Sequence, residues 1–260
     1  MSRIYPLFSS SKGNSSFIGS PKGGILIDAG VSCKRLCDAL HDNDIPAEAV
    51  KGIFITHTHS DHIQGLKTFT NKYNIPVFAQ QTNLTELENK QKVSVKCKLI
   101  AVDSCDICIA DYRIHSFETP HDTPASCGYR IETPDGKTVV ICTDLGQVTS
   151  VIEQNLTGAD MILLESNYDE QMLRNGSYPY DLKMRISSNH GHLSNNDCGT
   201  QLVKLLKSGT YKFILGHLSQ ENNTPLIAEQ AAVSSLSEFK RNHDYMLWTA
   251  KPCGGTAVVF

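Results

Sequence analysis

The sequence predicts an α/β protein in which two β-sheets pack face to face beneath outer helices, a four-layer αββα sandwich. Short strands alternate with amphipathic helices in the first third of the chain and again from residue 148 onward, whereas residues 97–143 carry only strand-like runs. Strand clusters with helices before, between and after them are typical of two packed sheets covered by helices. We expect residues 1–260 to form one domain of this kind, although the pattern does not give the strand order.

Apolar spacing and turn residues place the elements of the first third. Cys33, Leu36, Cys37 and Leu40 recur at helical spacing and predict an amphipathic helix. The runs GILIDAG and GIFIT are short and apolar, which is typical of buried strands. The expected strands are residues 3–8, 15–19, 24–30, 52–56 and 76–79, and the expected helices are residues 32–43 and 63–74.

The remaining elements follow from the same signals. The tripeptide PDG at 134–136 predicts a tight hairpin between two strands. The expected strands are residues 98–102, 106–110, 112–119, 127–133, 137–143, 161–166, 211–217, 245–249 and 255–260. The expected helices are residues 148–158, 195–209 and 223–242.

Composition narrows the class of protein. No apolar run approaches the ~20 residues of a membrane span, and the N-terminus has no signal-peptide pattern, so we expect a cytoplasmic protein with no membrane partner. The net charge of −3 argues against a general duplex binder but leaves room for a local basic groove. The nine scattered cysteines indicate reduced, mostly buried thiols. Cys105 and Cys108 form a C-x-x-C with no second pair to complete a zinc ribbon.

Residues 57–62 read HTHSDH and follow directly after an expected strand. In α/β proteins this edge of a sheet is where ligands bind. His57 and His59 are two apart in an extended loop and should point the same way, whereas Asp61 and His62 should aim at a second point nearby. The alternative is a helix cap with incidental surface histidines. Four metal-capable residues in six positions favour metal binding.

Three other expected strands also end in a metal-capable side chain. His121 follows residues 112–119, Asp144 follows residues 137–143, and His217 ends residues 211–217. Each is a polar residue that closes an apolar run, as His57 does. We therefore expect these three to complete the site.

The series HTHSDH, PHD, TD and GH resembles the ligand series of the metallo-β-lactamase superfamily. The stretches LFSSSKGNSSFI, FITHTHSDHIQGL and LGHLSQENN are similar to its YycJ/VicX-type (WalJ-like) hydrolase and exonuclease group. The resemblance implies a metallo-β-lactamase fold and two metal ions. It assigns one ion to His57, His59 and His121, the other to Asp61, His62 and His217, and a bridging position to Asp144. Where the group is expected to have SNHD, this chain has SNYD, so no histidine role carries over to Tyr168.

A pair of divalent ions favours hydrolysis. Two adjacent ions lower the pKa of a bridging water, polarise the electrophile and stabilise the leaving oxygen. Asp61 is expected to orient the resulting hydroxide as well as to bind metal. A ligand set of imidazole and carboxylate suits Zn²⁺ and also Mn²⁺ or Fe.

Features outside the ligands favour phosphorus as the electrophile. Ser11 and Asn14 lie in the turn SSSKGN, which suits either a phosphate nest or a plain hairpin turn. Lys183 and Arg185 supply positive charge. His192 resembles a histidine that, in the nuclease branch, contacts the scissile phosphate or protonates the leaving oxygen, while the following residues read as a helix cap.

The favoured interpretation is a dinuclear-metal-dependent phosphodiesterase that acts on nucleic acid, as a DNA exonuclease. Two alternatives stay open: a thioesterase or lactonase that hydrolyses a small carbon ester, and a metal-binding regulatory protein without turnover. Metal identity, exonuclease polarity and oligomeric state do not follow from the sequence.

Overall fold

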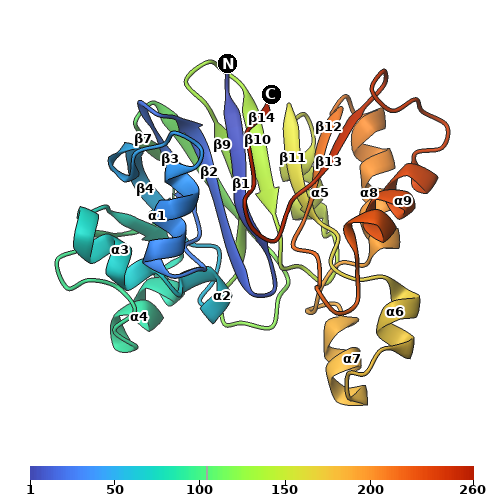
Figure 1. Ribbon diagram of the computed structural model, residues 1–260, viewed down its shortest axis with the longest axis horizontal. Helices are drawn as coiled ribbons and strands as arrows, with labels where there is room; N and C mark the ends of the chain where they lie inside the picture. Colours follow the sequence, from blue (N-terminus) through green and yellow to red (C-terminus); the bar gives the residue numbers. More distant parts are fainter. Residues whose placement is uncertain (104) are drawn as a thin grey trace.

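The computed structural model describes residues 1–103 and 105–260 and contains two seven-stranded sheets. Helices α1, α3 and α4 cover one sheet, and α8 and α9 cover the other (Figure 1). One apolar cluster lies between the sheets and one lies beneath each helical layer. The predicted four-layer αββα sandwich is confirmed.

The first sheet has the strand order β14-β1-β2-β3-β4-β5-β6. Strands β1 to β3 pair antiparallel, and β3 to β6 pair parallel. Its strands are β1 (Arg3–Ser10), β2 (Gly13–Ser20), β3 (Gly23–Ile27), β4 (Val50–Phe54), β5 (Val77–Ala79), β6 (Leu99–Ala101) and β14 (Val258–Val259).

The second sheet repeats this arrangement in the order β13-β12-β11-β10-β9-β8-β7. Strands β10 to β13 pair parallel, and β7 to β10 pair antiparallel. The predicted hairpin at 134–136 joins β9 to β10, with Gly136 at a φ of 73°. The strands are β7 (Ile107–Ile109), β8 (Tyr112–Glu118), β9 (Cys127–Glu132), β10 (Thr138–Cys142), β11 (Met161–Glu165), β12 (Lys212–Gly216) and β13 (Met246–Thr249).

Two of the expected helices differ in extent from the observed ones, and α4, α6 and α7 were not predicted. Gly65 lies between α2 and α3, at a position where a Cβ atom would lie 2.2 Å from the Val31 carbonyl oxygen. The expected helix 223–242 is too long, since the chain turns after Ser235 so that Leu236 and Phe239 both pack against the second outer core. The helices are α1 (Cys33–His41), η1 (Ala47–Ala49), α2 (Ser60–Ile63), α3 (Leu66–Tyr73), α4 (Gln81–Asn89), α5 (Ser150–Leu156), α6 (Glu170–Asn175), α7 (Tyr180–Ile186), α8 (Asn195–Lys207) and α9 (Pro225–Ser235).

Alternate side chains of β4 pack into two different apolar clusters. Ile53 faces the outer helices, whereas Phe54 faces the second sheet, where its ring stacks on Phe78 and meets Tyr129 edge-on. Burial of a side chain of this size contributes about 1.5–3 kcal/mol. The Tyr129 hydroxyl also donates to the Ile55 carbonyl oxygen at 2.7 Å. This bond ties the second sheet to the segment that leads into HTHSDH.

All nine cysteines are free, but the expectation that most are buried is wrong. Only Cys127, Cys142 and Cys198 are buried. Cys108 is exposed because it lies on β7, which is the edge strand of its sheet, and Cys105 just before it is exposed too. Among the helices of the described residues, none is long and apolar enough to cross a membrane.

Candidate metal centre

The loop after β4 holds three imidazoles close together. His57 and His62 are fully buried, and His59 is half-buried. The Nε2 atom of His57 lies 3.1 Å from Nδ1 of His59, so the two rings face a common point, as their spacing predicts. Between His59 and His62, helix α2 starts at Ser60 and turns His62 toward a different part of the cavity.

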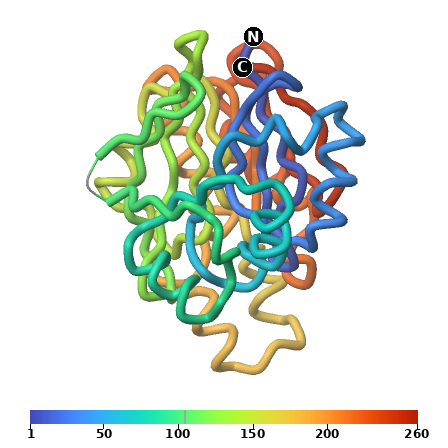
Figure 2. The backbone as a smooth tube through the Cα atoms, turned by 90° about the vertical axis from the view of Figure 1, so that its left-hand side faces the viewer, coloured from blue at the N-terminus to red at the C-terminus, as the bar shows by residue number. Residues whose placement is uncertain are grey.

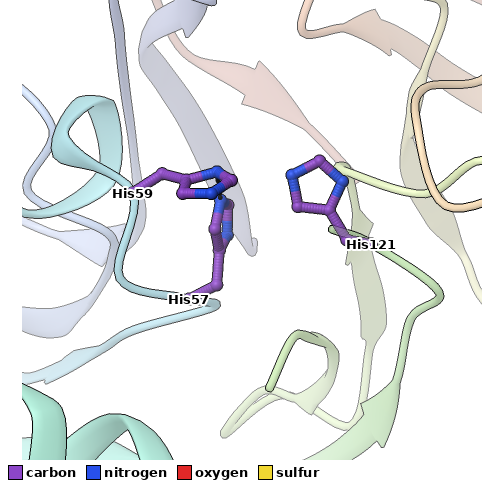
Figure 3. A group of neighbouring side chains, drawn as sticks. All are labelled: His57, His59 and His121. Atoms are coloured by element: carbon purple, nitrogen blue, oxygen red, sulfur yellow. Dashed lines mark hydrogen bonds between the residues drawn. The ribbon is translucent and has the colours of Figure 1, made fainter. Parts of the chain in front are cut away.

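His121 approaches the same point from the second sheet. Its ring centre lies 5.0 Å from that of His57 and 5.1 Å from that of His59 (Figure 3). Its Nδ1 lies 3.0 Å from the Gly191 carbonyl oxygen, which makes Nδ1 the protonated atom and leaves Nε2 free. The three histidines offer nitrogen atoms within 4.8 Å of one another, which suits a single ion.

A second group lies beside the first. Asp61, His62 and His217 offer atoms within 4.8 Å of one another. Asp144 belongs to both sides, because it forms such a group with His57 and His62 and another that includes His217. One carboxylate oxygen of Asp144 is 3.5 Å from His62 Nε2, and the other is 3.4 Å from His217 Nδ1. All seven predicted ligands therefore lie in one cluster, with Asp144 between the two groups.

Asp28 was not singled out in the sequence, and it holds His62 in place. It is buried just beyond β3, and one of its oxygens lies 2.8 Å from His62 Nδ1. The same carboxylate accepts hydrogen bonds from the backbone N–H and the hydroxyl of Thr56. His62 Nε2 is thereby directed toward the other ligands. Metal-binding histidines commonly donate their other ring N–H to a carboxylate, which fixes the orientation of the ring.

Glu165 was also missed, and it orients two histidines. It ends β11 fully buried, and its Oε1 lies 2.8 Å from His192 Nδ1 and 2.7 Å from His217 Nδ1. Its other oxygen accepts from the backbone N–H groups of Leu145 and Leu193. Both histidines therefore carry their proton on Nδ1 and present Nε2 to the cavity.

The electrostatics of the cavity favour a cation. Burial, and then the neighbouring rings of His62 and His121, lower the pKa of His57 well below its usual value, so its lone pair is available. At His217 burial acts in the same direction, but Asp144 and Asp61 outweigh it and raise the pKa to about 10. Without metal, a proton on His217 balances the buried carboxylates.

Two buried polar atoms test whether the residues fit a metal ion. Asp144 Oδ2 and His217 Nε2 have no hydrogen-bond partner among the described residues. An unpaired buried carboxylate oxygen is costly, and a metal ion is one of the partners that removes the cost. The site therefore fits a metal centre built from imidazole and carboxylate.

Three residues of the site have a left-handed backbone. The φ angles of Asp28, Asp144 and His217 are 60°, 59° and 53°. Each residue stands one or two positions beyond the end of β3, β10 or β12. This conformation costs roughly 1–2 kcal/mol per residue. Such strain is concentrated at functional sites, where the surrounding structure compensates for it.

The four predicted substrate contacts occupy different places. Asn14 is buried and donates to the Ser10 carbonyl oxygen at 2.9 Å and to Asp61 Oδ2 at 3.2 Å, which favours a positioning role. Ser11 and Arg185 line a cavity of about 160 Å³ that also includes His192. Lys183 lies on the opposite side of α7 and donates to the Arg174 carbonyl oxygen. Tyr168, which stands where SNHD would have a histidine, lines the same hollow as Lys183.

Residues 24–217, a span that includes all seven predicted ligands, match the family model described as a Beta-lactamase superfamily domain. The chain belongs to the metallo-β-lactamase superfamily. Among members of this superfamily, it is 37% identical over 235 residues to Exodeoxyribonuclease WalJ of Streptococcus pneumoniae, a match that covers 89% of this chain and 87% of that protein. It is 32% identical over 233 residues to Exodeoxyribonuclease YycJ of Bacillus anthracis, covering 89% of this chain and 88% of that protein.

A solved structure shares the metallo-β-lactamase fold over the whole chain. Zinc-bound PqqB from Methylobacterium extorquens superimposes with a TM-score of 0.77 at 14% identity and covers 100% of each chain. At this identity the likeness concerns the fold alone. The superfamily and the fold implied by the HTHSDH, PHD, TD and GH series are thus confirmed.

Proposed function

We propose that the protein is a metal-dependent exodeoxyribonuclease, which hydrolyses phosphodiester bonds at the end of a DNA strand. The observation that carries this proposal is a pair of adjacent metal-capable groups, with Asp144 close to residues of both. It is supported by the relatives at 37% and 32% identity, both of which are named exodeoxyribonucleases.

The ligand assignment follows the two groups. His57, His59 and His121 would hold one divalent ion, and Asp61, His62 and His217 would hold the other, with Asp144 between them. When bound, two such ions polarise the phosphodiester and acidify water. Zn²⁺ suits this donor set, and Mn²⁺ or Fe would also be accepted. Asp61, held by the Asn14 amide, has a carboxylate oxygen placed to orient the attacking water.

His192 is the proton donor in this proposal. Burial lowers its pKa, but the Glu165 carboxylate outweighs burial and raises it, so the ring is protonated more readily than a free histidine. In the protonated ring, Nδ1–H donates a hydrogen bond to Glu165, and the proton on Nε2 is available for the leaving oxygen of the scissile bond. A positioned general acid of this kind contributes typically ~10²–10⁴-fold to the rate.

Arg185 and Ser11 are the substrate contacts nearest to His192. They line the cavity of about 160 Å³ in which His192 lies. The Arg185 guanidinium pairs with Asp122, whose carboxylate is also 3.3 Å from His121 Nε2. A phosphate that enters this cavity meets Arg185 at its mouth, and the guanidinium fork suits phosphate oxygens.

The proposal is tested by an activity panel on protein reconstituted with metal. Single-stranded and duplex DNA, RNA and bis-nitrophenyl phosphate are compared with acyl-thioesters and lactones. We expect nucleotide release from DNA that stops with a chelator and weakens as salt rises. Thioester or lactone hydrolysis with inert DNA would instead establish the carbon-ester alternative, and no turnover on any substrate would establish a regulatory metal protein.

A further inference from the structure

Helix α7 (Tyr180–Ile186) has no fully buried residue. With α6 (Glu170–Asn175) it extends beyond the ends of the two sheets (Figure 1, Figure 2). Surface helices of globular proteins normally bury one apolar face. We call residues 170–186 the α6–α7 platform and ask what its uncovered faces bind.

One face of α7 opens toward the metal centre. Leu182, Arg185 and Ile186 follow one another at helical spacing and line the cavity of about 160 Å³. The opposite wall of that cavity includes His192 and Gly191. Tyr178, from the segment that joins α6 to α7, lines the same space. A nucleotide beside the scissile bond therefore has an arginine and an aromatic ring within its cavity.

The other face of α7 lines a larger hollow of about 500 Å³. Tyr180, Lys183 and Met184 contribute from α7, and Arg174 contributes from α6. Tyr180 is 74% exposed and Met184 is 51% exposed, so neither side chain is used to hold the fold together. The Lys183 ammonium group donates to the Arg174 carbonyl oxygen at 2.9 Å and links the two helices.

The side chains of the platform suit one unpaired strand. Arg174, Lys183 and Arg185 offer positive charge, and two tyrosines offer ring faces on which bases stack. Three cations stand beside the acidic Glu170 and Asp181, and Arg185 pairs with Asp122, so the positive charge is too small for the extended basic face of a duplex binder. The chain as a whole carries −3. Single-strand sites instead combine a few cations with aromatic stacking.

We infer that the α6–α7 platform holds an unpaired DNA strand as it enters or leaves the metal centre. Arg185 binds the phosphate next to the scissile bond, and Tyr178 stacks on a base in the smaller cavity. Tyr180 stacks on a base farther along the strand, where Lys183 and Arg174 bind phosphates. A duplex must unpair at its end to use this path. The inference rests on the proposed nuclease function and adds the form of its substrate.

The test is binding of fluorescent oligodeoxythymidine to Tyr180→Ala, with His192→Ala in every protein to slow turnover. Loss of a base-stacking contact should weaken binding about 5-fold or more. The matched control is Tyr211→Ala. Tyr211 is an exposed tyrosine just before β12, at the end of that strand away from His217. The control should bind the oligonucleotide as tightly as the parent does. A blunt duplex should bind more weakly than oligodeoxythymidine and should not distinguish the two variants.

A kinetic measurement on the otherwise wild-type protein separates this inference from the nuclease proposal. In Tyr180→Ala, the ratio of kcat/KM for oligodeoxythymidine to kcat/KM for bis-nitrophenyl phosphate should fall about 5-fold or more, because the small substrate has no neighbouring base. If the parent degrades DNA while Tyr180→Ala and Lys183→Ala match it in binding and in this ratio, the platform is refuted and the nuclease proposal stands. A parent that binds the oligonucleotide through Tyr180 without cleaving it would refute the nuclease alone.

Discussion

At the metal centre, most side chains project from the ends of buried strands and several are fixed by a further contact, whereas α7 has no buried residue and two open faces. His62 and His217 illustrate the first case, because Asp28 and Glu165 hold the ring atom that faces away from the cavity. Tyr180 illustrates the second, with three-quarters of its surface free. The chemistry is thus placed on rigid, pre-oriented groups, and strand recognition is placed on an adaptable surface.

The largest effect is expected from Asp144, which lies close to residues of both metal groups. Asp144→Ala should lose at least one of two bound ions, and DNA hydrolysis should fall roughly 10³-fold or more. Asp160→Ala is the matched control. Asp160 precedes the first residue of β11, at the end of the strand away from Glu165 and the metal centre, and it pairs with Lys137. Elemental analysis and nucleotide release measure the two quantities. Retention of both ions in Asp144→Ala would show that it is not a ligand.

His192→Ala should keep both ions and remain folded but lose ~10²–10⁴-fold in the rate of DNA hydrolysis. The loss should be smaller with bis-nitrophenyl phosphate, whose leaving group needs no proton. Equal losses on both substrates would assign His192 to binding or to the cap of α8, and a fall in metal content would make it a ligand.

Glu165→Gln should reduce activity or metal affinity ~10–100-fold, since one glutamine cannot accept from two imidazoles and two backbone N–H groups at once. It should also change the pH profile. The acid is active when protonated, so DNA hydrolysis falls as pH rises through the pKa of His192. Glu165 raises that pKa, so the fall should begin at lower pH in the variant. The two profiles are compared at a metal concentration that saturates both proteins, so that bound ions affect them alike. An unmoved profile would contradict the assignment.

The smallest effect concerns the platform. Lys183→Ala should weaken kcat/KM on single-stranded DNA a few-fold and reduce the slope of its logarithm against log salt by about 0.7, the value for one phosphate contact. Lys207→Ala, at the far end of α8, should leave the slope unchanged. The same slope in both variants would remove Lys183 from the DNA path.

The metal centre and the platform also differ in how far the sequence predicted them. The seven predicted ligands include polar residues that close apolar runs, a pattern that local sequence displays directly. Asp28 and Glu165 follow the same rule in LIDAG and LLES, but the rule cannot tell a ligand from a residue that holds one. Asn14 was assigned to substrate from its place in the turn SSSKGN. Its contact with Asp61 joins positions 47 residues apart, which local sequence does not display.

The platform helices escaped prediction for a different reason. In α7, Leu182, Met184 and Ile186 alternate with polar residues, a spacing typical of a strand. Helix α6 has six residues, which is too short to display a helical period. Helix α4 buries only Asn83, Leu84 and Leu87. Local pattern therefore located the sandwich and its strand ends but not the short helices that surround the site.

The left-handed backbone at Asp28, Asp144 and His217 also limits how this site can be copied or altered. Aspartate, asparagine, histidine and glycine are the residues that tolerate such angles, whereas β-branched residues are genuine outliers there. The backbone thus restricts the replacements available at these positions before any metal chemistry does. A designer who transplanted the seven side chains onto strand ends of ordinary geometry would misdirect Asp144 and His217. A transplanted site would need each of these side chains together with its left-handed backbone conformation.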